Sequence, residues 1–283
     1  MSSIYTVADG ISTLGKIKYN IKNKEIFDIS VKAFNKYSKY KNSTINLNYF
    51  IQTLSITSSL EGGFDAINTY DKAGLSVGFI QFARPNIGVY KLLSLYDKIL
   101  GDEVKNAFGI VDSYIDTKSL KSRIDSILLS KVQKSIITPA GLEAQLQLCI
   151  EDYYDKAFSK YLSLKFSPEI DNSPSATNKK IINGANLNVS TNNIFTNSLP
   201  TTIDTNPYKI YALAFIFDIG VNQGIGKVDN KGKDSINQVT IGGIDMTEGN
   251  FLSYHVLGDK KIYMLPQRRE FWEQVILDNF IKE

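Results

Sequence analysis

Two carboxylates and a hydroxyl lie close together in the first third of the sequence. Glu61 is followed by Asp71 ten residues later and by Ser76 fifteen residues later. A glycosidase places two carboxyl groups on either side of one sugar–sugar bond, and one of them protonates the leaving oxygen. Glu61, Asp71 and Ser76 are therefore the candidate catalytic residues, and the elements around them must supply the geometry.

The segment before Glu61 has the pattern of an amphipathic helix that ends at Gly62-Gly63. Its apolar residues recur at i, i+3, i+4 and i+7, namely Leu47, Phe50, Ile51 and Leu54. Continued at roughly 100° per residue, this helix would place Glu61 about 40° from Leu47, facing the body of the protein. Apolar surroundings raise the pKa of a carboxyl group, as a general acid near neutral pH requires.

The segment after Glu61 predicts a β-hairpin. Residues 66–70 and 75–82 have strand-like composition, and the turn between them begins at Asp71. Aspartate is also common in ordinary turns that have no catalytic role, so Asp71 could be such a turn residue. Alternation along the second strand places Ser76, Gly78 and Ile80 on one face and Val77, Phe79 and Gln81 on the other. Ser76 and the backbone of Gly78 would then face a cleft beside Asp71.

These residues resemble known motifs of the lysozyme-like superfamily. Glu61, Asp71, Ser76 and Gly78 are similar to the Glu…Asp…Thr…Gly pattern of phage-type lysozymes. The stretch Ser-Val-Gly-Phe-Ile-Gln-Phe, which ends at residue 82, resembles the Gly-Leu-Met-Gln segment of lytic transglycosylases and goose-type lysozymes. Ser replaces the usual Thr.

Two later stretches extend the resemblance over roughly residues 45–281, with gaps. Residues 141–158 are similar to a helix that follows the hairpin in this superfamily, and 212–224 resemble a buried helix ending in Asn-X-Gly. The resemblance implies an α+β, mainly α, lysozyme-like fold with a small β-hairpin at the active site. It also implies a catalytic domain over 43–283, with long inserted loops at about 167–206 and 225–263, after an arm or docking segment over 1–42.

Composition limits the classes of function. The chain has 283 residues, of which 43 % are hydrophobic, with one Cys, one His and a formal net charge of +3. These values indicate an ordered globular protein, and the charge is too small to indicate nucleic-acid binding. The lone Cys149 is expected to be buried, and a single His255, in a segment with strand-like character, disfavours zinc and Ser-His-Asp chemistry. No metal or cofactor is predicted.

The second half of the chain contains further candidate residues. Asp218 and Asn222 share one face of the most apolar predicted helix, 208–221, and Gln223 follows it. Two interpretations stay open for Asp218: it pairs within the core, or it lines a cleft and binds N-acetyl groups with Asn222 and Gln223. A closing helix over 266–282 is expected to turn Trp272 inward and Arg268 outward.

The resemblance and the candidate residues together predict a peptidoglycan-degrading glycoside hydrolase. It would cleave the β-1,4 bond between N-acetylmuramic acid and N-acetylglucosamine. In this hypothesis Glu61 is the general acid, and Asp71 and Ser76 position water or stabilise positive charge. The sugar contacts would be Tyr70, Gly78, Gln81, Asp218, Asn222 and Gln223.

Three alternatives stay open. A lytic transglycosylase would use Glu61 alone, and a chitosanase-like enzyme would act on a related amino-sugar polymer. A structural component of a phage tail or injection apparatus, docked through the N-terminal arm, would keep the fold as a scaffold.

The route to the cell wall is also an expectation. The first ten residues lack the features of a signal peptide, and no stretch is long enough to span a membrane. We therefore expect synthesis in the cytoplasm and action on the wall after lysis, by injection or as part of a particle.

Overall fold

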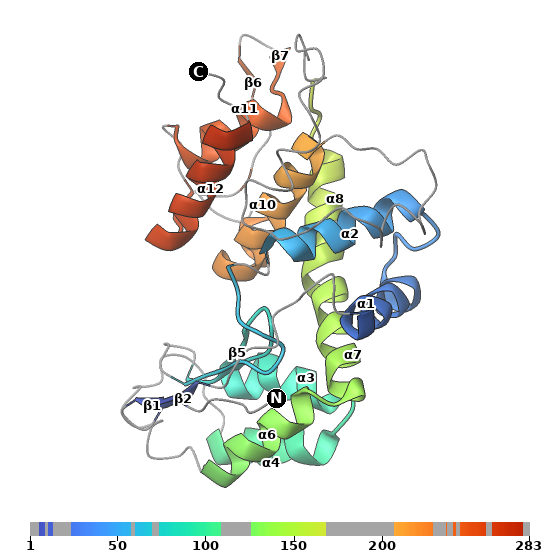
Figure 1. The fold of residues 1–283 in the computed structure, drawn as a ribbon, viewed down its shortest axis with the longest axis vertical. Helices are drawn as coiled ribbons and strands as arrows, with labels where there is room; N and C mark the ends of the chain where they lie inside the picture. The colour runs from blue at the N-terminus through green and yellow to red at the C-terminus, as the bar shows by residue number, and fades with distance from the viewer. Residues whose placement is uncertain are drawn as a thin grey trace. The chain divides into compact units, whose positions relative to one another are not determined.

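The computed structural model is mainly helical, with a small three-stranded antiparallel sheet, which confirms the coarse prediction of an α+β, mainly α protein (Figure 1). The structure describes residues 6–8, 11–13, 24–57, 60–69, 74–108, 126–167, 207–228, 236, 240–241, 244–258 and 262–279. The predicted insert over 167–206 therefore lies, but for its first residue, outside the described residues. Tyr70 and Asp71 lie outside them as well.

The chain divides into two compact units. Unit 1 comprises residues 1–33 and 61–149, and unit 2 comprises 34–60 and 150–283. Helix α1, Lys24–Tyr37, spans the division at residue 33. The predicted arm over 1–42 and catalytic domain over 43–283 stay predictions.

Unit 1 combines short strands with helices. A two-stranded ladder, β1 and β2, precedes α1; the three-stranded sheet has the order β3-β4-β5 and runs into a π-helical turn, η1. In the part of unit 1 that the structure describes, four α-helices follow η1. The bounds are β1 Thr6–Ala8, β2 Ile11–Thr13, β3 Ile67–Asn68, β4 Ser76–Val77, β5 Phe82–Ala83, η1 Arg84–Val89, α3 Tyr90–Ser94, α4 Lys98–Phe108, α6 Ser126–Ile136 and α7 Pro139–Leu148.

Unit 2 is built around the predicted apolar helix. Helix α10 is buried along Ile210–Ile219 and packs against α2, α8 and α11, which confirms it as the central buried helix. Aromatic rings contact it; the ring centroids of Phe217 on α10 and Tyr154 are 6.4 Å apart. The elements are α2 Thr44–Thr57, η2 Cys149–Tyr154, α8 Asp155–Ser163, α10 Pro207–Gln223, η3 Ile225–Lys227, β6 Thr240–Ile241, β7 Ile244–Asp245, α11 Glu248–Val256 and α12 Pro266–Asn279.

Several predicted boundaries were wrong. The apolar spacing predicts helices over 104–115 and 120–134. Helix α4 instead begins at Lys98, and α6 continues to Ile136; residues 109–125 lie outside the described residues. Turn residues around 238–244 predict a hairpin in the segment 225–263. The structure has this hairpin, β6–β7, but also the unpredicted helix α11, so that buried His255 is helical rather than strand-like. The signal was present, because Thr247 caps α11 by accepting a hydrogen bond from the Asn250 backbone N–H at 3.3 Å.

The sequence Thr138-Pro139 predicts a helix start with a side-chain cap, and the start of α7 confirms it. The Thr138 side-chain oxygen accepts a hydrogen bond from the Gly141 backbone N–H at 3.1 Å, and Pro139 occupies the first helical position. Gly141 is required here, because a Cβ at this position would lie 2.4 Å from the Ser135 carbonyl oxygen. The connection between α6 and α7 is therefore short and tightly closed.

Replacing the cap should weaken the protein measurably. Thr138→Ala removes the acceptor for the Gly141 N–H, and we expect a loss of about 1 kcal/mol in the free energy of unfolding, measured by urea denaturation. Thr138→Ser keeps the hydroxyl and serves as the matched control. Equal losses in the two variants would show that the hydroxyl is not the stabilising group.

Candidate active site

Glu61 lies outside helix α2. The helix ends at Thr57, and the Leu60 backbone N–H donates to the Thr57 carbonyl oxygen at 2.9 Å. The predicted placement of Glu61 by continued helical rotation was therefore wrong, because the helix stops four residues before it. Glu61 instead begins the loop 61–66, where its side chain is half-buried.

The loop 61–66 packs against residues 78–79, which follow the second strand of the hairpin. The Ala66 N–H donates to the Gly63 carbonyl oxygen at 3.0 Å, and the Gly78 N–H donates to the Ala66 carbonyl oxygen at 2.8 Å. Phe64 is fully buried and stacks on Phe79, with ring centroids 4.4 Å apart. The loop and the hairpin thus form one packed structure in unit 1.

The hairpin is confirmed, but its second strand is shorter than predicted. Strand β3 pairs with β4 in antiparallel register, with Asn68 opposite Ser76, and β4 ends at Val77. Residues 78–81 form a turn, so the predicted alternation of faces through Gln81 does not apply. Ser76 is only 1 % exposed, so its side chain is removed from solvent.

The turn has strained backbone geometry. Gly78 has φ +79°, and the non-glycine residues Gln81 and Arg84 have φ +54° and +70°. Such angles cost roughly 1–3 kcal/mol for a residue with a side chain, and they often occur at functional sites. Of these residues, the strained Gln81 lies in the segment that resembles the transglycosylase motif, and Arg84 follows that segment.

The Gln81 side chain of the turn lies against Gly62, the residue that follows Glu61. The Gln81 Nε2 donates to the Gly78 carbonyl oxygen at 2.9 Å. A Cβ on Gly62 would lie 2.9 Å from that same Nε2 and 2.7 Å from the Ala66 Cβ. Glycine at 62 is therefore needed for close approach, whereas the sequence predicted it only as a helix terminator.

Gln145 is a residue of this site that the sequence analysis did not identify. Its side chain is fully buried, and its Nε2 donates to the carbonyl oxygens of Phe64 at 3.0 Å and Ile136 at 2.9 Å. Its Oε1 accepts from the Phe79 N–H at 3.1 Å. The available signal was an amide within the apolar face of the predicted helix, three residues after Leu142.

Asp218 lies in the core of unit 2, where it is 1 % exposed. Arg268 forms an ion pair with it, and the Trp272 Nε1 donates to its other oxygen at 2.9 Å. Burial raises the pKa of Asp218, while the guanidinium and the indole N–H lower it; burial is the larger effect. Of the two interpretations, the structure has the internal pairing of Asp218 with Arg268 and Trp272.

The surroundings of Asp218 also test the predicted orientation of α12. Arg268 is 9 % exposed, so its predicted outward orientation was wrong, whereas Trp272 is buried as predicted. Asn222 and Gln223 lie half-buried at the end of α10, and the Gln223 Nε2 donates to the Asn222 Oδ1 at 3.3 Å. Their role as sugar contacts stays a prediction.

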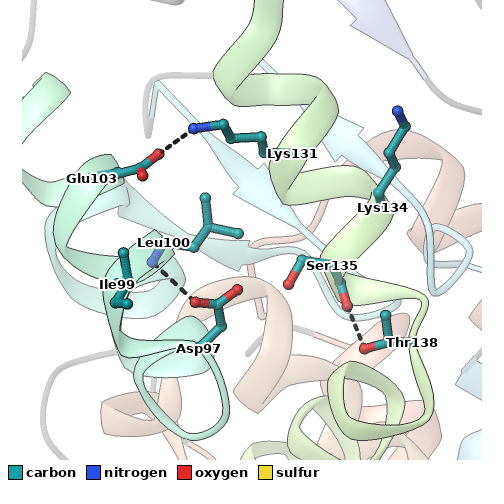
Figure 2. A pocket seen from close by; sticks show the side chains of 8 residues that line it. All are labelled: Asp97, Ile99, Leu100, Glu103, Lys131, Lys134, Ser135 and Thr138. Carbon is teal, nitrogen blue, oxygen red and sulfur yellow. Dashed lines mark hydrogen bonds and ion pairs between the residues drawn. The ribbon is translucent and has the colours of Figure 1, made fainter.

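A groove in unit 1 lies between α4 and α6 (Figure 2). It has a volume of about 550 Å³, and none of the predicted site residues lines it. Lys131 and Glu103 pair across it at 2.9 Å, as Figure 2 shows. The lining residues are Asp97, Ile99, Leu100, Glu103, Lys131, Lys134, Ser135 and Thr138.

Within the described part of the chain, no cluster of His, Cys, Asp and Glu could hold a metal ion. Cys149 is buried, as predicted. Among those same residues, no helix is both long and apolar enough to cross a membrane. Comparisons with protein-family models, with curated proteins and with solved structures gave no match to the chain.

The Asp218–Arg268 pair should be sensitive to removal of one partner. Arg268→Met leaves a buried carboxyl without its guanidinium, and we expect a loss of about 3–5 kcal/mol in the free energy of unfolding. The double variant Asp218→Leu/Arg268→Met should recover much of this loss, because neither charge then has to be buried. A double variant as unstable as Arg268→Met would contradict this account.

The stability that Arg268→Met loses relative to wild type should depend on pH. Without Arg268 the pKa of Asp218 rises further above its ordinary value of 3.8. The contribution of a group with a raised folded-state pKa is complete below the unfolded pKa and is lost as pH rises through the folded one. Arg268→Met should therefore lose less stability relative to wild type at about pH 4 than at about pH 7.

Proposed function

We propose that the chain is a peptidoglycan-degrading glycoside hydrolase that uses Glu61 as its general acid. The observation that supports this proposal best is the framework of Glu61. A half-buried carboxyl begins a loop that is fixed by a buried amide, Gln145, and packed against a strained turn at Gly78–Gln81. A catalytic group must be held in this way to meet a reacting bond in a fixed geometry.

The proposed reaction follows from the position of a single acid. Glu61 donates its proton to the oxygen of the glycosidic bond as the bond to the anomeric carbon breaks. Water then adds to that carbon, and its proton passes to a carboxylate, for which Asp71 is the candidate. Ser76 is buried, so in this proposal its side chain stabilises the hairpin and does not contact the water.

A lytic transglycosylase is the second candidate. In that reaction the sugar's own C6 hydroxyl attacks the anomeric carbon, its proton returns to Glu61, and a 1,6-anhydro ring forms. The observation that favours it is the ordered Gln81 side chain against Gly62, next to Glu61, in the segment that resembles transglycosylases. This reaction needs no second carboxylate, so Asp71 would then be a turn residue.

The products of purified peptidoglycan distinguish these proposals. Mass spectrometry of soluble fragments should show reducing-end muropeptides from wild type, and Glu61→Gln should lower their rate of release by about 10² to 10⁴-fold. Glu103→Gln, which changes an exposed carboxylate elsewhere in unit 1, is the matched control and should retain activity.

Other results have distinct meanings. Anhydro ends that persist in Asp71→Asn would establish the transglycosylase. Products from chitosan alone would indicate the chitosanase-like alternative. No products from either polymer, in a folded wild-type protein, would contradict the enzyme proposal and favour a structural component of a tail or injection apparatus.

A further inference from the structure

The Gln145 side chain uses both of its N–H donors and its oxygen on backbone groups. The donors go to the carbonyl oxygens of Phe64 and Ile136, and the oxygen accepts from the Phe79 N–H. Phe64 belongs to the loop 61–66, called the Glu61 loop, and Ile136 is the last residue of α6. Phe79 belongs to the turn 78–81, called the hairpin turn. One side chain thus joins three segments that are distant in sequence.

No other residue type supplies this combination at the same length. Glutamate has no N–H donors, methionine has neither donors nor a strong acceptor, and asparagine is one methylene shorter. The neighbouring backbone is also adapted to the amide. A Cβ on Gly78 would lie 2.3 Å from the Gln145 Oε1, and Gly78 has φ +79°. Glycine at 78 leaves the space that the amide oxygen occupies.

The hydrogen bonds form a closed circuit through the Glu61 loop. Gln145 holds Phe64 on one side and Phe79 on the other, and between them the Gly78 N–H donates to the Ala66 carbonyl oxygen. Phe64 is three residues after Glu61. Movement of the Gln145 amide would therefore displace the loop that begins at Glu61.

We propose that Gln145 is the positioning residue of the catalytic site, which sets the Glu61 carboxyl against the hairpin without touching substrate. This inference rests on the proposed function, because it assigns the purpose of the circuit to Glu61. Its structural part, the coupling of loop and turn by a single amide, can be tested separately.

The test uses Gln145→Glu, which keeps the acceptor for the Phe79 N–H and removes both N–H donors. Gln147→Glu, the same change two residues along α7 on a half-buried side chain, is the matched control. Hydrogen exchange should show the Phe79 amide still protected in Gln145→Glu, whereas the Ala66 and Gly78 amides exchange faster. Gln145→Met, which removes the acceptor, should expose the Phe79 amide as well.

The kinetic expectation is a loss in kcat with KM little changed. Misplacement of a catalytic group by about 1 Å can cost about 10²-fold, and we expect a loss of this order for Gln145→Glu on peptidoglycan fragments. The loss should diminish at lower pH, because a protonated carboxyl can donate one hydrogen bond again. Gly78→Ala, which displaces the amide oxygen without changing Gln145, should lower kcat in the same way.

The outcomes separate the two proposals. An inactive wild type with the expected exchange pattern would overturn the proposed function and the catalytic purpose of Gln145, but would uphold the coupling. An active wild type with unchanged kcat in folded Gln145→Glu and Gly78→Ala would overturn the positioning role alone. If Gln145→Glu does not fold, the kcat of Gly78→Ala alone tests the positioning role, and an unchanged kcat overturns it.

Discussion

The side-chain amide of Gln145 is removed from water, and its hydrogen bonds must therefore be made inside the protein. This constraint organises unit 1. The backbone of the Glu61 loop at Phe64, the hairpin turn at Phe79 and the last turn of α6 at Ile136 each supply one partner. An unmatched amide would cost more than the bonds contribute, so the three segments are held in one arrangement.

Unit 2 meets a related constraint with charge instead of an amide. Asp218 is buried within the most apolar helix of the chain, and Arg268 and Trp272, both from α12, satisfy its two oxygens. A buried ion pair contributes little net stability relative to apolar packing, yet it strongly disfavours arrangements that separate its partners. It therefore specifies how α12 docks on α10 more than it strengthens unit 2.

Elements whose signals lie in neighbouring residues were predicted correctly from the sequence. Features that depend on partners far away in the sequence were not. The Thr138 cap, the buried helix α10 and the β3–β4 hairpin follow from neighbouring residues. The direction of Glu61 was wrongly predicted, because α2 ends at Thr57, before the Gly62-Gly63 pair that the sequence analysis took as its end. Arg268 was placed outward, because its partner lies fifty residues away in the sequence. For the same reason the role of Gln145 was missed, since its partners lie on other elements.

The three hydrogen bonds of Gln145 differ greatly in the length of chain that they close. Ile136 is nine residues away, whereas Phe79 and Phe64 are 66 and 81 residues away. Closing a short loop costs less conformational entropy, and contacts between near neighbours form sooner. We therefore expect the α6–α7 connection to form early in folding. It would orient the Gln145 side-chain amide before the hairpin packs against it. The Glu61 loop and the turn at Phe79, which close chain lengths of similar size, would then pack together onto helices that have already formed.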